Sequence, residues 1–305
     1  METARTTIQG GSDNSDLVDN SSFIAEVGRL TALVASRILK RAVPQQNLDL
    51  LELQNTRDCG LNMGHEDNKL IRIGFSVAEA SLESGARVTI SSSSDSRVKS
   101  SISSLQKSYP DGKITGHTCD LSKDSLEDDV SALFAKVGKV DHIIYTAGDS
   151  LAQMPLSSIT LPSIIAAGQI RFFAPLIVAK IGSKHLNPGP ESSIVLTTGA
   201  VAERPHEGWS VIASYAAGLY GMTRNLALDL RPVRVNCVSP GAVDTELWKG
   251  MGEDEKKMMF ERIGGNVLTG RVGRPEDVAE TYLWLMKDSN VTGFVASSNA
   301  GSTLV

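Results

Sequence analysis

From about Ile71 to Gly241, helical stretches alternate with short strands that are rich in β-branched residues. Helices are predicted at 75–84, 95–109, 125–137, 161–186 and 211–230, and strands within 86–91, 113–121, 140–148, 192–199 and 233–241. Strands that are joined by a helix run parallel, so the pattern predicts βαβ units and a sheet with helices on both faces. We therefore expect an α/β fold with a doubly wound parallel sheet, which binds ligands at the carboxyl ends of its strands.

Residues 1–70 do not show this alternation of helices and strands. Residues 1–21 are rich in Ser, Asn, Asp and Gly, which predicts a disordered tail. Apolar residues at helical spacing in 23–43 predict an amphipathic helix, whereas residues 44–70 carry no strong signal of either kind. The expected organisation is a tail at 1–21, an N-terminal extension at 22–70, which an incorrectly assigned exon would also explain, and one main domain at 71–305.

Composition narrows the classes of partner. A net charge of -5 argues against nucleic-acid binding, which usually needs a basic face. Gln169, Arg171, Pro175 and Lys180 interrupt the most apolar stretch, residues 163–182, so a buried helix is favoured over a membrane span. The polar, acidic N-terminus does not resemble a signal peptide. The three cysteines are widely separated, which suits a cytoplasmic protein without a metal site.

Five short motifs accompany the expected elements in order: GARVTI (85–90), CDLS (119–122), YTAG (145–148), RVNCVSPGAVDTEL (234–247) and GRVGRPEDVAE (270–280). Each motif alone is weak, but their order resembles the short-chain dehydrogenase/reductase (SDR) family, and most of all its fungal members in specialised metabolism. The resemblance implies a Rossmann-like fold of SDR type, a small-molecule substrate, a nicotinamide cofactor and a homodimer or homotetramer.

The resemblance also implies which residues bind the cofactor. Asp120 and Leu121 match the element near the adenine ring, and Gly148 would let the backbone pass close to the ribose. Pro240 and Gly241 turn the chain off a strand, although strand–turn–helix punctuation without a ligand is the alternative. The complete expected set is Gly74, Ser92, Ser93, Arg97, Asp120, Leu121, Ala147, Gly148, Pro240, Gly241, Val243 and Thr245.

The residues after the second expected strand bear on the choice of cofactor. NAD-selective sites place a carboxylate there, which holds the ribose 2′-hydroxyl. This chain has Ser91 to Ser94 and then Arg97, whose guanidinium suits a 2′-phosphate, while Asp95 lies one or two positions beyond the expected carboxylate. We therefore expect NADP(H) rather than NAD(H); a solvated polar loop is the alternative.

The phosphate loop departs from the family pattern TGxxxGIG, whose amides hold a pyrophosphate at a helix N-terminus. Its last glycine corresponds to Gly74, and the two earlier glycine positions fall on Asn68 and Arg72. Arg72 could touch a phosphate, but its side chain obstructs the close backbone approach that glycine permits.

The catalytic Asn, Ser, Tyr and Lys of the family are a second departure. Their positions fall near Arg171, at Thr198 or Gly199, at Ile212 and at Ala216. In the family the Lys lowers the Tyr pKa and the Tyr gives its proton to a carbonyl oxygen. Tyr215 and Tyr220 do not fit this register, so the ordinary proton relay is expected to be absent.

A carbonyl needs a proton donor as charge develops on its oxygen, whereas an iminium ion accepts hydride without an acid. We therefore expect an NADP(H)-dependent reductase of fungal specialised, alkaloid-type metabolism, acting on an imine, iminium or carbonyl. In its most specific form, which resembles the malbrancheamide/paraherquamide group, a Diels–Alder cyclisation is coupled to reduction. Catalytic candidates are Arg171, His206, Asp149 (alternatively a helix cap) and Thr198. The competing hypothesis is a non-redox, SDR-like ligand-binding or regulatory protein.

Overall fold

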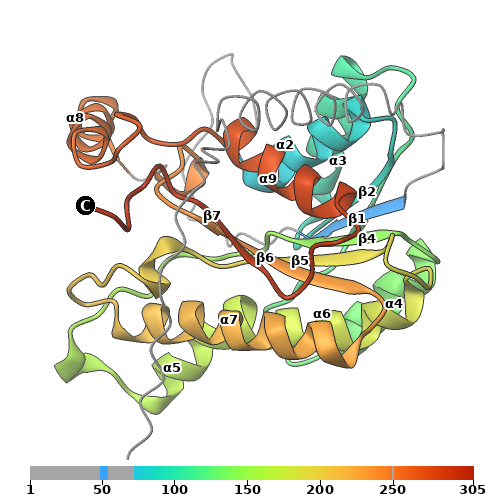
Figure 1. Ribbon diagram of the computed structural model, residues 1–305, viewed down its shortest axis with the longest axis horizontal. Coiled ribbons are helices and arrows are strands. Elements are labelled where there is room, and N and C mark those ends of the chain that lie inside the picture. The colour runs from blue at the N-terminus through green and yellow to red at the C-terminus, as the bar shows by residue number, and fades with distance from the viewer. Residues whose placement is uncertain (1–48, 54–71, 249–250) are drawn as a thin grey trace, which may run out of the picture. The chain divides into compact units, whose positions relative to one another are not determined.

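A computed structural model describes residues 49–53, 72–248 and 251–305 (Figure 1). The sheet order is β3-β2-β1-β4-β5-β6-β7, and every neighbouring pair is parallel. This arrangement confirms the predicted parallel sheet. Its strands are β1 (Asp49–Leu53), β2 (Arg87–Ser92), β3 (Ile114–Thr118), β4 (His142–Tyr145), β5 (Ser193–Thr197), β6 (Arg234–Pro240) and β7 (Val295–Ser298).

Helices cover both faces of the sheet (Figure 1). One face carries α2 (Ile73–Glu83), α3 (Asp95–Ser108) and α9 (Pro275–Lys287), and the other carries α4 (Leu126–Val137), α6 (Ala174–Gly182) and α7 (Ser210–Asp229). Two further helices are α5 (Leu161–Gly168) and α8 (Glu253–Gly264), and short 3₁₀ turns are η1 (Leu156–Ser158), η3 (Ser183–His185), η4 (Ala200–Ala202) and η5 (Glu246–Trp248). The doubly wound architecture is therefore as predicted.

The sheet begins earlier than the sequence analysis placed it. β1 lies between β2 and β4, with Leu50 opposite Val88 on one side and His142 on the other. It falls within 44–70, where no strong signal was expected, so the domain start predicted at residue 71 is too late. A five-residue strand, DLLEL, without a β-branched residue has weak intrinsic β signal, and pairing on both sides overrides it. The tail predicted at 1–21 and the helix predicted at 23–43 lie outside the described residues.

The long helix predicted at 161–186 is interrupted by a π-helical turn, η2 (Gln169–Phe173), between α5 and α6. The N–H of Ala174 bonds to the carbonyl of Gln169, five residues earlier. Pro175 has no N–H to offer the carbonyl of Arg171, so the regular α-helical ladder cannot pass this point unchanged. The wider turn is the local result, and such turns occur frequently at functional sites.

This helical run also explains the apolar stretch noted in the sequence. Among the described residues, Leu161–His185 is long and apolar enough to cross a membrane by length and composition, with a hydropathy of 1.6. A core helix passes the same test, and Val178 and Ala179 of α6 are fully buried against the sheet. Packing against the sheet therefore accounts for the buried part of its apolar composition.

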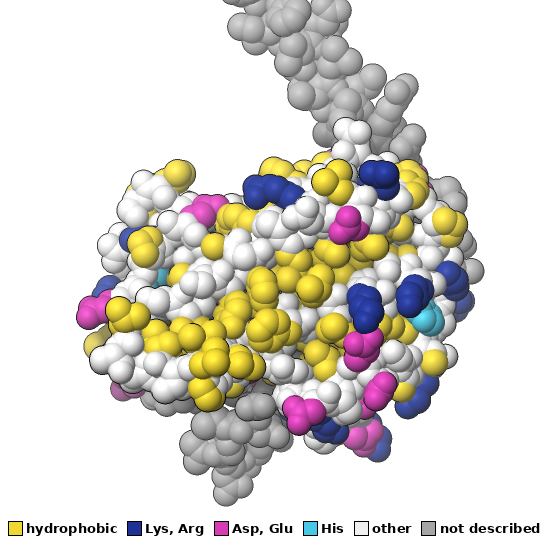
Figure 2. Space-filling view, turned by 90° about the horizontal axis from the view of Figure 1, so that it is seen from below, with side chains coloured by type: hydrophobic (Ala, Val, Ile, Leu, Met, Phe, Trp, Pro, Cys, Tyr) yellow, Lys and Arg dark blue, Asp and Glu magenta, His cyan; other side chains and the backbone are white. Residues whose placement is uncertain are grey.

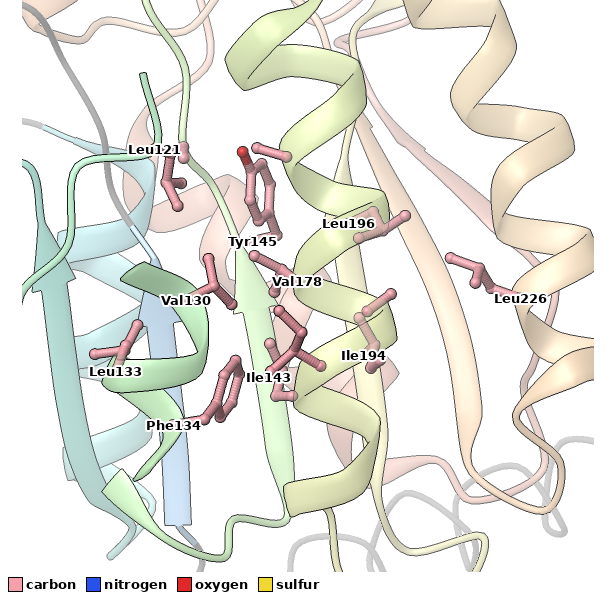
Figure 3. Close-up of a cluster of buried hydrophobic side chains, with 14 of the residues drawn as sticks. Leu121, Val130, Leu133, Phe134, Ile143, Tyr145, Val178, Ile194, Leu196 and Leu226 are labelled. Atoms are coloured by element: carbon pink, nitrogen blue, oxygen red, sulfur yellow. The ribbon is translucent and has the colours of Figure 1, made fainter. Parts of the chain in front are cut away.

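The larger hydrophobic core fills the space between the sheet and the layer of α4 and α6 (Figure 3). Phe134, Ile143, Val178 and Ile194 are fully buried there. Complete burial of side chains of this size contributes about 1.5–3 kcal/mol each. A Cβ at Gly182 would lie 2.6 Å from Ile143 and Phe134, so glycine permits the close approach of α6 to β4. This packing fixes the strand ends that carry the site.

Candidate cofactor and active site

Because all strands are parallel, their carboxyl ends lie along one edge of the sheet, and α2 begins at the same edge (Figure 1). Most residues expected in the site directly follow a strand. They come from the segments after β2, β3, β4, β5 and β6. The sheet thus gathers residues that are far apart in the sequence, as expected for ligand binding in this kind of fold.

A guanidinium and two hydroxyls form a small cluster after β2. Arg97 donates from Nε to Ser94 Oγ at 3.0 Å and from Nη2 to Ser93 Oγ at 2.8 Å. Ser94 is also the N-cap of α3 and accepts from the Arg97 backbone N–H. The hydroxyl of Ser92 is buried and has no hydrogen-bond partner among the described residues.

Of the two expected site residues that follow β3, Asp120 lies at the sheet edge and the side chain of Leu121 lies in the core. Asp120 accepts from the backbone N–H and the hydroxyl of Ser122 at 3.0 and 2.7 Å, so its carboxylate closes its own turn. The Leu121 side chain lies in the hydrophobic core, 1% exposed (Figure 3). The structure therefore brings Asp120 to the sheet edge but leaves only the Leu121 backbone for ligand contact.

An ion pair connects the loop after β4 with the π turn. Arg171 donates from Nε to Asp149 Oδ1 at 3.0 Å and from Nη2 to the Asp149 carbonyl. Its guanidinium lies against Gly148, where an added Cβ would be 3.2 to 3.4 Å from the guanidinium atoms. Arg171 and Asp149, which the sequence analysis named separately, therefore form one ion pair. The absence of a side chain at Gly148 leaves room for the Arg171 guanidinium.

Tyr145, at the end of β4, holds the π turn in place. Its hydroxyl donates to the carbonyl of Ile170 at 2.5 Å, directly before Arg171. Burial raises the pKa of Tyr145 well above its ordinary value, so it remains a neutral donor. The backbone at Ile170 is thereby anchored to β4, and this restricts the position of the adjacent Arg171.

The positions that the resemblance equates with the proton relay hold Thr198, Ile212 and Ala216. Thr198 donates its hydroxyl proton to the carbonyl of Ala216 at 2.8 Å. Ile212 and Ala216 are both buried. At the positions that the resemblance assigns to Ser, Tyr and Lys, the chain therefore has a hydroxyl bonded to the backbone and two buried apolar side chains.

The two nearby tyrosines have other partners. Tyr215 donates to the carbonyl of Ile164 at 3.0 Å and packs on Phe172. Tyr220 donates to Glu203 at 2.9 Å, and burial together with Glu203 raises its pKa to about 12. Neither hydroxyl is suited to release a proton near neutral pH.

His206 lies at the surface, on a loop that reaches toward the loop after β4. Its ring packs on Trp209, with 5.0 Å between ring centroids. Gly208, with φ of +76°, accepts a backbone hydrogen bond from Met154 at 2.9 Å. This bond ties the two loops together at Met154, while the His206 ring itself stacks on Trp209.

The segment after β6 is shaped by close backbone contacts. A Cβ at Gly241 would lie 2.9 Å from the backbone of Asn299, so the turn after Pro240 needs glycine. The Val243 carbonyl accepts from the indole of Trp248 at 2.8 Å, and Thr245 accepts from the Trp248 backbone at 3.2 Å. The expected segment 240–245 is therefore a tightly folded turn at the sheet edge.

Arg72 and Glu246 form an ion pair that sequence reasoning missed. Arg72 is the N-cap of α2, two residues before the buried Gly74, and donates from Nε to Glu246 Oε2 at 2.6 Å. Each side chain is 15% exposed. The sequence singled out Arg72 as a departure from glycine, but the only signal for Glu246 was its position directly after the SPGAVDT turn.

Comparisons with known proteins agree with this arrangement. Residues 68–305 match the SDR-like Rossmann domain family. The short-chain dehydrogenase/reductase fsr5 of Gibberella fujikuroi is 44% identical over 242 residues, which cover 76% of this chain and 91% of that protein. The structure of the MalC reductase/Diels–Alderase from Malbranchea aurantiaca superimposes with a TM-score of 0.78 at 34% identity, covering 87% of this chain and 100% of that one.

A small-chain dehydrogenase solved in complex with NADPH is similar at a TM-score of 0.67 and 25% identity, over 85% of this chain and 100% of that one. With a family match that extends from residue 68 to residue 305, the chain belongs to the short-chain dehydrogenase/reductase family.

Proposed function

We propose that the protein is an NADP(H)-dependent reductase of fungal specialised, alkaloid-type metabolism that transfers hydride to a small organic imine or iminium ion. The observation that carries the proposal is that the Thr198 hydroxyl donates to the Ala216 carbonyl while the side chains of Ile212 and Ala216 are buried. A site without a proton relay suits a substrate that is already cationic, because hydride addition then leaves no oxyanion to protonate. The similarity to a protein described as a reductase/Diels–Alderase supports the same class.

The residues present fit an NADP(H) molecule at the sheet edge. The Ser93–Ser94–Arg97 cluster offers a guanidinium and hydroxyls to a 2′-phosphate, and the buried Ser92 hydroxyl lies beside it without a partner among the described residues. Asp95, the nearest carboxylate to the family's NAD position, instead pairs with Lys99 on the exposed surface at 2.7 Å. These contacts favour NADP(H) over NAD(H).

NADP(H), when bound, supplies the hydride; the chain's own residues hold and orient the substrate. Asp149 fixes the direction of the Arg171 guanidinium, which stands where the loop after β4 meets the π turn. Ile212 and Ala216 keep water away from the reacting face. His206 is the remaining candidate proton donor for a carbonyl substrate and would need its loop to turn the ring inward.

The decisive experiment separates cofactor binding from chemistry. Titration with NADPH, followed by its fluorescence, should show saturable binding, whereas a non-redox regulatory protein would show none. A preformed cyclic iminium should then be reduced at least about 100-fold faster than the matching ketone, because only the ketone needs an acid. Turnover of the ketone alone would contradict the proposed chemistry.

The likeness to MalC also supports a second, coupled activity, an intramolecular Diels–Alder cyclisation of the reduced product. A substrate that carries both an iminium and a dienophile should give one cyclised stereoisomer in excess when the protein is present. The same isomer ratio in buffer and with protein would limit the activity to reduction.

We further propose a homodimer or homotetramer. Figure 2 shows hydrophobic side chains gathered on the face below the sheet, and four exposed ones lie along one helical run: Leu161, Ile165, Phe173 and Leu176. Large apolar patches on soluble proteins commonly mark interfaces. Ile165→Glu with Leu176→Glu should shift the mass in analytical ultracentrifugation to that of a monomer. Leu304→Glu, at a more exposed site elsewhere, is the control and should leave the assembly intact.

A further inference from the structure

The Arg72–Glu246 ion pair lies at the start of α2, and its two residues are 174 positions apart in the sequence. In a doubly wound fold the helix after the first strand directs its free N–H groups at the pyrophosphate of a dinucleotide. Arg72 caps this helix with its backbone carbonyl, which accepts from Ser76 at 3.1 Å, and has no side-chain capping bond. Its guanidinium is directed instead to Glu246.

A carboxylate beside this helix start occupies a region that favours negative charge. The positive end of the helix dipole and the Arg72 guanidinium both stabilise an anion there. Because each partner is only 15% exposed, the pair is partly desolvated and its attraction is stronger than at the open surface. Glu246 and a pyrophosphate would therefore compete for the same cation.

The segment that carries Glu246 is also connected to α8. Asp244 pairs with Lys256 at 2.8 Å, and the Trp248 ring packs on Phe260 at 6.1 Å between centroids. Both contacts lie within two residues of Glu246. The backbone on either side of Glu246 is therefore held against α8.

We propose that Arg72 exchanges the Glu246 carboxylate for the pyrophosphate when NADP(H) binds, so that Glu246 lowers cofactor affinity in the free protein. This inference rests on the proposed function. In this proposal Arg72 binds the pyrophosphate from a position where the family has glycine. Glu246 then becomes a determinant of cofactor affinity.

The test compares NADPH binding by the full-length wild type and by Glu246→Gln, using fluorescence titration. At low salt the dissociation constant should fall by about tenfold in the variant, since a competing charge has been removed from a partly buried site. The difference should shrink at high salt through screening. Asp244→Asn, which removes a carboxylate of the same segment that faces Lys256, is the matched control and should change the constant by less than about twofold.

Two further measurements locate the effect. Adenosine 2′-monophosphate lacks the pyrophosphate, so its affinity should be equal in wild type and Glu246→Gln. In an Arg72→Gln background, the Glu246→Gln change should lose more than about half of its effect, as expected for coupled neighbours.

The outcomes separate the two proposals. NADPH binding by the wild type with no gain in Glu246→Gln would overturn the ion-pair inference and leave the proposed function intact. Binding by neither protein would overturn both. An equal gain in NADPH affinity in Asp244→Asn would mean that the loss of any negative charge on this segment raises the affinity. That result would also overturn the proposed exchange.

Discussion

Replacing Arg171 with Ala is expected to lower turnover of an iminium substrate by about 100-fold, while the NADPH dissociation constant changes by less than about threefold. The guanidinium is held by two oxygen atoms of Asp149 and lies against Gly148, so its direction is set before substrate arrives. Preorganised groups of this kind contribute most where charge changes during reaction. Single-turnover rates and fluorescence titration measure the two quantities separately.

Two variants distinguish orientation from charge. Arg171→Lys keeps the charge but loses the planar fork, so most of the loss should persist. Asp149→Asn leaves the guanidinium in place with a weaker acceptor and should cause a smaller fall in turnover. Equal losses in turnover and NADPH affinity, with an unchanged unfolding midpoint, would instead identify Arg171 as a cofactor ligand.

Replacing Arg234 with Leu is expected to reduce the free energy of unfolding by about 3–5 kcal/mol. Arg234 is 2% exposed and donates to the carbonyls of Pro190, Leu285 and Met286 at 2.5, 2.5 and 2.7 Å. Leucine would leave these carbonyls buried without their donors, and each loss costs about 1–3 kcal/mol before relaxation. Urea unfolding measures the change.

Arg224→Leu on the exposed face of α7 is the matched control, with an expected change within about 0.5 kcal/mol. Arg234→Lys should fall between the two, since one ammonium cannot reach all of the carbonyls that the guanidinium fork spans. A loss below about 1 kcal/mol in Arg234→Leu would mean that water replaces the guanidinium.

Arg234 belongs to the RVN segment at 234–236, and this segment has a structural role. The RVN segment helped to identify the family, and the structure shows two of its side chains tying β6 to neighbouring segments. Asn236 donates to the Val291 carbonyl at 2.8 Å and accepts from the Phe294 N–H at 3.1 Å. The side chains of this motif therefore stabilise β6 beside the turn at 240–245, and no spacing in the sequence distinguishes this structural role from ligand binding.

The sequence alone determined the fold class, because helical and strand periodicities are local and their alternation leaves few arrangements besides a parallel sheet. It missed β1, since a short leucine-rich strand acquires its identity from neighbours on both sides. The sequence also placed the expected ligand-binding segments at strand ends, and the parallel sheet brings these segments to one edge.

Only the tertiary structure decided which polar residues meet. Arg171 and Asp149 were each named from the sequence, but their pairing depends on the π turn, which Tyr145 anchors and which ends just before Pro175. Arg72 and Glu246 meet because β6 and α2 reach the same sheet edge. Side-chain pairs of this kind depend on how elements distant in the sequence pack together. Local sequence patterns therefore cannot predict them.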